Sequence, residues 1–131
     1  MASSWMRSTG AVLGGFFATA VLSVGTDAVL HATGVFPPVG ERMSDALFGL
    51  AALYRAAYTV AGGALTAKLA PDRPMGHAVV LMVLGLLGGA AGAVVSWQHP
   101  ELGPRWYALS IPISAVPCIW AGARLGMRRG A

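Results

Sequence analysis

Four long apolar runs, separated by short connections, constrain this chain of 131 residues more than any other feature. We place the runs at about residues 10–33, 45–69, 77–97 and 106–126. Each supplies the ~20 residues that a helix needs to cross a hydrocarbon layer of ~30 Å. The chain is 56% hydrophobic and 11% charged, whereas a typical soluble domain is about 25% charged. The pattern predicts an all-α, polytopic membrane protein: a four-transmembrane-helix bundle that forms one integral membrane domain over residues 1–131.

Prolines in the connections predict where the helices end. Pro37 and Pro38 separate the first run from the second, and Pro71 ends the second run, because proline lacks the N–H that continues a helix. Ser44 directly precedes the second run, where its hydroxyl can cap the first helical turn. A secretory signal is the alternative for the first run. That run is long for a signal and no A-x-A cleavage site follows, which favours a retained helix.

The Lys and Arg residues predict how the helices are oriented. With both termini in the cytoplasm, the cytoplasmic side carries Arg7, Lys68, Arg73, Arg124, Arg128 and Arg129. The outer side then carries Arg42 and Arg105, together with the acidic residues Glu41, Asp45 and Glu101. Cytoplasmic loops of membrane proteins are enriched in Lys and Arg. We therefore expect a multi-pass protein of a bacterial inner (plasma) membrane, with a cytoplasmic N-terminus and C-terminus.

Charge and cysteine content exclude several classes of function. The net charge is +4, but the basic residues are spread over the connections and the C-terminus, so nucleic acid is not an expected partner. Cys118 is the only cysteine, which excludes an internal disulfide and a CxxC redox pair. The expected partners are the lipid bilayer and either a second copy of the chain or another membrane protein.

Ionisable residues within the first two runs are the candidates for a functional site. Ser23, Asp27 and His31 recur every four residues, so they lie roughly 6 Å apart along one side of a helix. Arg55 lies at a similar depth in the second run. An unpaired Arg at that depth costs about 2.5–3.5 kcal/mol. The two residues Asp27 and Arg55 are therefore predicted to pair across adjacent antiparallel helices.

Other polar groups of the second run lie on the side of Arg55. Tyr58, Thr59 and Thr66 project within about 60° of it, at 100° per residue. With Ser23, Asp27 and His31 opposite, they form a predicted polar seam between the first two helices. The seam either joins the helices or lines a small cavity, open to the outer face, that binds a proton, an ion or a small polar ligand. The candidate ligand-binding or proton-binding residues are Ser23, Asp27, His31, Arg55 and Tyr58.

The third and fourth runs carry residues that shape helix packing. Gly85, Gly88, Gly89 and Gly92 form overlapping small-xxx-small patterns, which let helix backbones approach closely, within the chain or between copies. Pro112 and Pro117 are predicted to bend the fourth helix. That bend either has no role beyond packing or shapes one wall of a cavity facing Arg55.

The sequence leaves the specific role open. HxxxH and HExxH patterns, P-loops and nucleophile elbows are absent from it, so no catalytic residue, metal or cofactor is predicted and a non-enzymatic role is favoured. The first hypothesis is a small membrane protein whose polar seam is structural or binds a small ligand or a partner. The second is a small oligomeric transporter or channel-like protein using Asp27, His31 and Arg55. The third is an enzyme acting on a lipid or quinone, with Tyr58 and His31 near the substrate.

Overall fold

The computed structural model describes residues 2–38, 43–99 and 103–130. These residues form four helices and no strand: α1 (Ala2–Ala32), α2 (Asp45–Leu69), α3 (Pro74–Gln98) and α4 (Arg105–Gly130). The all-helical fold with four helices is therefore confirmed. The charged residues Glu41, Arg42 and Glu101, used above to predict orientation, lie outside the described residues.

The helix ends follow from local chemistry. The helix α2 begins at Asp45, where the predicted cap Ser44 accepts a hydrogen bond from the Leu47 N–H. The helix α3 begins earlier than expected, at Pro74, because proline is tolerated in the first helical turn. The helix α1 also begins earlier, at Ala2, since no helix-breaking residue separates its first turns from the apolar run.

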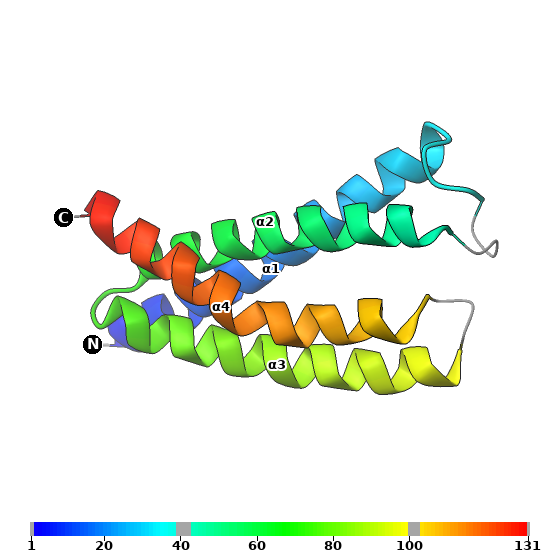
Figure 1. Ribbon diagram of the computed structural model, residues 1–131. Coiled ribbons are helices and arrows are strands. Elements are labelled where there is room, and N and C mark those ends of the chain that lie inside the picture. Colours follow the sequence, from blue (N-terminus) through cyan, green and yellow to red (C-terminus); the bar gives the residue numbers. More distant parts are fainter. Residues whose placement is uncertain (1, 39–42, 100–102, 131) are drawn as a thin grey trace.

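The helix α2 is central to the bundle and packs against each of the other three. Both termini lie at one end of the bundle, beside the α2–α3 connection (Figure 1). The helix α1 contacts α2 and α3 but, among the described residues, not α4. Toward its C-terminal end α1 moves away from α3 (Figure 1). This divergence leaves room between α1 and α3 in the half of the bundle far from the termini.

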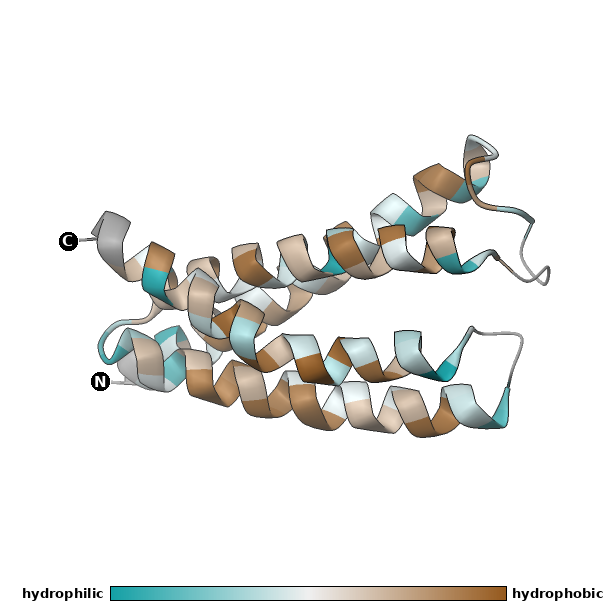
Figure 2. Ribbon diagram, viewed as in Figure 1, coloured by the Kyte–Doolittle hydropathy of each residue, from teal (hydrophilic) through white to brown (hydrophobic). Residues whose placement is uncertain are grey.

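Three helices are long and apolar enough to cross a membrane: Trp5–Ala32, Pro74–Gln98 and Arg105–Met127. The fourth predicted span, α2, is not among them, because Arg55, two tyrosines and two threonines lower its hydropathy. Figure 2 shows apolar residues along all four helices. Large apolar side chains such as Leu53 (69% exposed) and Ile113 (68% exposed) point outward. Exposed apolar surface of this extent is unusual for a soluble monomer.

Small residues bring α2 and α4 into close contact. A Cβ atom at Gly122 of α4 would collide with the carbonyl oxygen of Val60, and one at Gly126 would lie 2.6 Å from the carbonyl oxygen of Ala64. From the other side, a Cβ at Gly63 would lie 2.5 Å from the Ile119 carbonyl oxygen. Close backbone approach at small residues is the usual way in which membrane helices pack.

The predicted glycine pattern of α3 divides into two pairs. Cβ atoms at Gly85 and Gly89 would lie 3.2 Å from Ala115 Cβ and 2.9 Å from Pro112 Cβ of α4, respectively. Gly85 and Gly89 therefore pack against α4. Gly88 and Gly92 have no neighbouring atom within 4 Å of such a Cβ, so these two glycines do not pack against another helix of this chain. The helix α4 changes direction along its length, as its two internal prolines predict (Figure 1).

Candidate functional site

Asp27 of α1 and Arg55 of α2 form the ion pair that the sequence predicts. Arg55 Nη2 donates to Asp27 Oδ2, and the hydroxyl of Tyr54 donates to Asp27 Oδ1. The carboxylate thus receives one donor at each oxygen, both from α2. Each side chain of the ion pair is 28% exposed. We call Asp27, Tyr54 and Arg55 together the Asp27 cluster.

Sequence reasoning did not single out Tyr54. It precedes Arg55 directly, so the two side chains diverge by about 100° around the helix. The Asp27 carboxylate lies where both side chains can reach it. The sequence gives one signal of this arrangement: Tyr54 is adjacent to Arg55, for which an acidic partner is predicted.

Tyr58 and Thr66 of the polar seam take part in further hydrogen bonds that join α1 to α2. The Tyr58 hydroxyl shares a hydrogen bond of 2.7 Å with Thr26 Oγ1. Thr19 Oγ1 donates to the Tyr58 carbonyl at 3.3 Å, and buried Thr66 donates to the Ala11 carbonyl at 2.9 Å. These hydroxyls have partners within the protein, which supports a structural role for this part of the seam.

His31 lies in a different environment from Asp27. Its Nδ1 is 2.9 Å from the carbonyl oxygen of Pro37, and its ring meets the edge of Phe36, with ring centroids 5.3 Å apart. Phe36 itself is buried. Through these two contacts, His31 stabilises the connection that follows α1. Of the five candidate residues, Ser23 and Arg55 line the cavity between the helices, whereas Asp27, His31 and Tyr58 do not.

A cavity of about 450 Å³ lies between all four helices. Its polar lining residues are Thr19, Ser23, Arg55, Thr59, Ser96 and Tyr107. The remaining lining residues are apolar or glycine, and they include all four glycines of the α3 pattern. The cavity exists because α1 diverges from α3 and because these glycines have no side chain to fill the space. Its volume falls in the range of about 300–1,000 Å³ that is typical of small-molecule sites.

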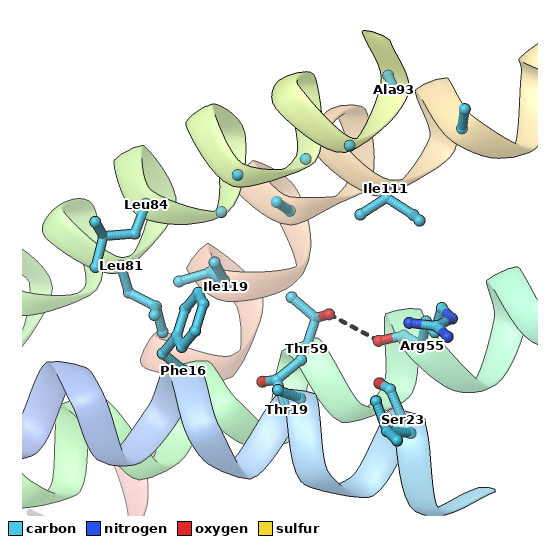
Figure 3. Close-up of a pocket in the computed structure, with 18 of the residues that line it drawn as sticks. Phe16, Thr19, Ser23, Arg55, Thr59, Leu81, Leu84, Ala93, Ile111 and Ile119 are labelled. Atoms are coloured by element: carbon cyan, nitrogen blue, oxygen red, sulfur yellow. Dashed lines mark hydrogen bonds between the residues drawn. The ribbon is translucent and has the colours of Figure 1, made fainter. Parts of the chain in front are cut away.

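The two ends of the cavity differ in polarity. Arg55 and Ser23 lie toward one end, together with the apolar Ile111 and Ala93, whereas Phe16, Leu81 and Leu84 lie toward the other (Figure 3). The helix α4 contributes Ile111, Ala115 and Ile119, so it does form one wall of a space that Arg55 also lines. The cavity is thus suited to a molecule with one polar end.

Arg55 connects the cavity with the Asp27 cluster. Its Nη2 pairs with Asp27, while its Nε is buried and has no hydrogen-bond partner among the described residues. Thr59 Oγ1 donates to the backbone carbonyl of Arg55 at 2.7 Å (Figure 3) and is not bonded to Nε. A buried N–H without an acceptor costs about 1–3 kcal/mol. An acceptor supplied by a ligand would remove that cost.

Comparison of the chain with protein-family models, with curated proteins and with solved structures finds no match. Within the part of the chain that the structure describes, no group of three or more His, Cys, Asp or Glu side chains is placed to hold a metal ion.

Proposed function

We propose that this chain is an integral membrane protein that crosses the inner membrane four times, with both termini in the cytoplasm. Three apolar helices and the outward-facing apolar side chains support insertion. The 25 residues of α2 are long enough to cross, and its polar side chains face helices that cover it on three sides. Trp97 and Trp106 lie at the end far from the termini, where Arg105 lies 5.4 Å from the Trp97 ring. Tryptophan is typical of a membrane interface.

This topology is tested by labelling single cysteines in intact cells. In a Cys118→Ala background, Thr33→Cys places a thiol after α1 and Asp72→Cys places one between α2 and α3; both positions are exposed. A membrane-impermeant maleimide is expected to label position 33 and to label position 72 only after the cells are opened. Labelling of position 72 in intact cells, with position 33 protected, would show the opposite orientation.

The cavity, in this proposal, binds a small and mostly apolar molecule whose polar end is a hydrogen-bond acceptor such as a carbonyl. One observation carries the proposal: Arg55 lines a cavity of about 450 Å³, and its Nε is a buried donor without a partner among the described residues. The ligand's acceptor binds this N–H, and the apolar end of the cavity holds the rest of the molecule.

The charge balance of the site favours an uncharged ligand. Arg55 is the only charged residue among the described residues that line the cavity, and Asp27 already neutralises it. An added anion or cation would remain uncompensated in an apolar environment, which is strongly unfavourable. A neutral acceptor satisfies the N–H of Arg55 without this cost.

Three probes of equal chain length separate these possibilities. We propose measuring the thermal unfolding of the detergent-purified protein with 2-undecanone, undecane or undecanoate. The ketone is expected to raise Tm most, the alkane less because it lacks the acceptor, and the carboxylate least because of its charge. Equal increases in Tm with the ketone and the alkane would show that Arg55 does not bind the ligand.

A double variant links the ketone preference to Arg55. Asp27→Leu with Arg55→Met removes both charges together, so it leaves no unpaired ion, and it is expected to abolish the difference between ketone and alkane. Thr26→Val is the matched control on α1, because Thr26 bonds Tyr58 and does not line the cavity. That control is expected to keep the wild-type preference.

Transport is the second candidate function. It is favoured by the 28% exposure of both Asp27 and Arg55, which leaves an ionisable pair only partly covered by the protein. Proteoliposomes containing a trapped pH-sensitive dye test it: a proton flux above that of protein-free vesicles, lost in the Asp27→Leu, Arg55→Met variant, would support transport. A flux equal to that of protein-free vesicles would exclude proton transport.

A further inference from the structure

A second groove lies between α1 and α3, at the end of the bundle that holds both termini. It has a volume of about 530 Å³. The helix α1 contributes Ser8, Thr9, Val12 and Leu13 to its lining. The other side is lined by Arg73, which directly precedes α3, and by Gly76, His77, Val80 and Leu84 of α3. From Arg73 to Leu84 it follows α3 for about 16 Å, at 1.5 Å per residue. The groove is separate from the cavity at Arg55, and only Leu84 lines both.

The groove has a polar end and an apolar end. Arg73, His77, Ser8 and Thr9 lie at the polar end, within the first turns of the two helices. The apolar end, further toward the middle of the bundle, is formed by Val12, Leu13, Val80 and Leu84. The order of these groups matches that of a phospholipid, in which a polar headgroup precedes an acyl chain.

Side chains from both helices hold the polar end together. His77 Nε2 is 2.9 Å from Ser8 Oγ, and His77 Nδ1 is 3.0 Å from the carbonyl oxygen of Arg73. These contacts join α1 to α3 and place a cation, an imidazole and two hydroxyls around one opening.

The guanidinium of Arg73 forms no ion pair among the described residues, and the Asp72 carboxylate beside it in the chain does not line the groove. None of the described residues that line the groove is acidic, and the ion pair found among the described residues joins Asp27 and Arg55, far along the bundle. The Arg73 side chain is exposed. A headgroup phosphate supplies the missing negative charge, and guanidinium groups bind phosphate oxygens strongly.

We propose that this groove binds one anionic phospholipid of the cytoplasmic leaflet. The phosphate contacts Arg73 at the polar end of the groove, and one acyl chain lies over Val80 and Leu84. The inference rests on the membrane orientation proposed above and not on the ligand of the Arg55 cavity. Free phosphate would satisfy Arg73 but would leave the apolar half of the groove uncovered, so the geometry favours the lipid.

Native mass spectrometry of the detergent-purified protein tests the proposal. The protein is mixed with equal amounts of palmitoyl-oleoyl phosphatidylglycerol and palmitoyl-oleoyl phosphatidylcholine. We expect one phosphatidylglycerol to be retained in preference to phosphatidylcholine. Arg73→Gln is expected to reduce that preference about fivefold, since one basic residue near anionic lipid contributes about 1 kcal/mol.

Two further variants separate a site from a general effect of positive charge. Lys68→Gln is the matched control, because Lys68 is exposed at the same end of the bundle but does not line the groove, and it is expected to change the preference less than twofold. Arg73→Lys keeps the charge and is expected to restore most of the preference. Equal losses in Arg73→Gln and Lys68→Gln would overturn the proposal.

Competition with inorganic phosphate tests for the lipid against a small anion. Millimolar phosphate is expected to leave the bound phosphatidylglycerol in place. Displacement by phosphate would show a headgroup site alone and would overturn the role of the apolar half. Absence of any preference for phosphatidylglycerol in the wild-type protein would also overturn the proposal, and it would leave the ketone-binding proposal for the Arg55 cavity untouched.

Discussion

Two nitrogen atoms of Arg55 lie in different environments. Its Nη2 binds Asp27 and so joins α1 to α2, while its Nε is buried and has no acceptor among the described residues. A single charged residue can therefore stabilise the bundle and bind a neutral ligand. The structural and ligand-binding interpretations of the polar seam are compatible, because they concern different atoms of the same side chain.

Removal of one member of the ion pair is expected to cost more stability than removal of both. Asp27→Leu leaves Arg55 unpaired and is expected to destabilise the protein by about 2 kcal/mol. Breaking a fully buried ion pair costs about 3–5 kcal/mol. The expected loss is smaller here because the two side chains are 28% exposed. The double change Asp27→Leu, Arg55→Met is expected to recover most of that loss. Unfolding of each variant in mixed micelles measures the effect. A double variant less stable than Asp27→Leu alone would contradict it.

The sequence predicted the positions of only some of the polar residues that it singled out. The pairing of Asp27 with Arg55 could be predicted because a short connection joins two antiparallel helices, and the two residues lie at similar depth in them. The position of His31 could not, since it depends on how the chain turns back at Pro37. Tyr107 could not be assigned to the cavity either, because its location depends on the packing of α4 against α2.

At the level of the helices, small residues decide which pairs pack closely. The sequence directed attention to the glycines of α3, yet the closest backbone approach is between α2 and α4, at Gly63, Gly122 and Gly126. Glycine patterns predict that a helix can pack closely; they do not predict which partner it packs against. The helix boundaries were more predictable, because proline and the Ser44 cap act locally.

Two glycine-to-alanine variants test this packing. Gly122→Ala places a methyl group against the carbonyl oxygen of Val60 and is expected to destabilise the protein by about 1–3 kcal/mol. Gly88→Ala is the matched control, since no atom lies within 4 Å of its new methyl group, and it is expected to be neutral or stabilising by up to about 1 kcal/mol. Thermal unfolding compares the two. Similar losses at both positions would show that α2 and α4 do not pack as described.

At the scale of the whole molecule, the cavity results from the unequal packing of α1. The helix packs against α2 along the polar seam, and its divergence from α3 leaves the space that Phe16, Ser23 and the α3 glycines line (Figures 1 and 3). Local sequence patterns cannot predict such a space, because it depends on the crossing angles of all four helices.

Filling the cavity is expected to block binding without unfolding the bundle. Gly92→Leu adds a side chain to the cavity wall at a position with no neighbouring atom within 4 Å, so we expect it to abolish the Tm increase with 2-undecanone. Gly25→Leu makes the same change on α1, also in open space but outside the cavity, and is expected to keep the increase. Loss of binding in both variants would contradict a site at this cavity.

A structure determined with a bromine-labelled ketone tests the central proposal most directly. In 11-bromo-2-undecanone, the anomalous signal of bromine locates the apolar end of the molecule and electron density locates the carbonyl. We expect bromine between Phe16 and Leu81, with the carbonyl oxygen within hydrogen-bond distance of Arg55 Nε. Bromine only on the outer surface of the helices, with no density beside Arg55, would contradict a ligand-binding cavity.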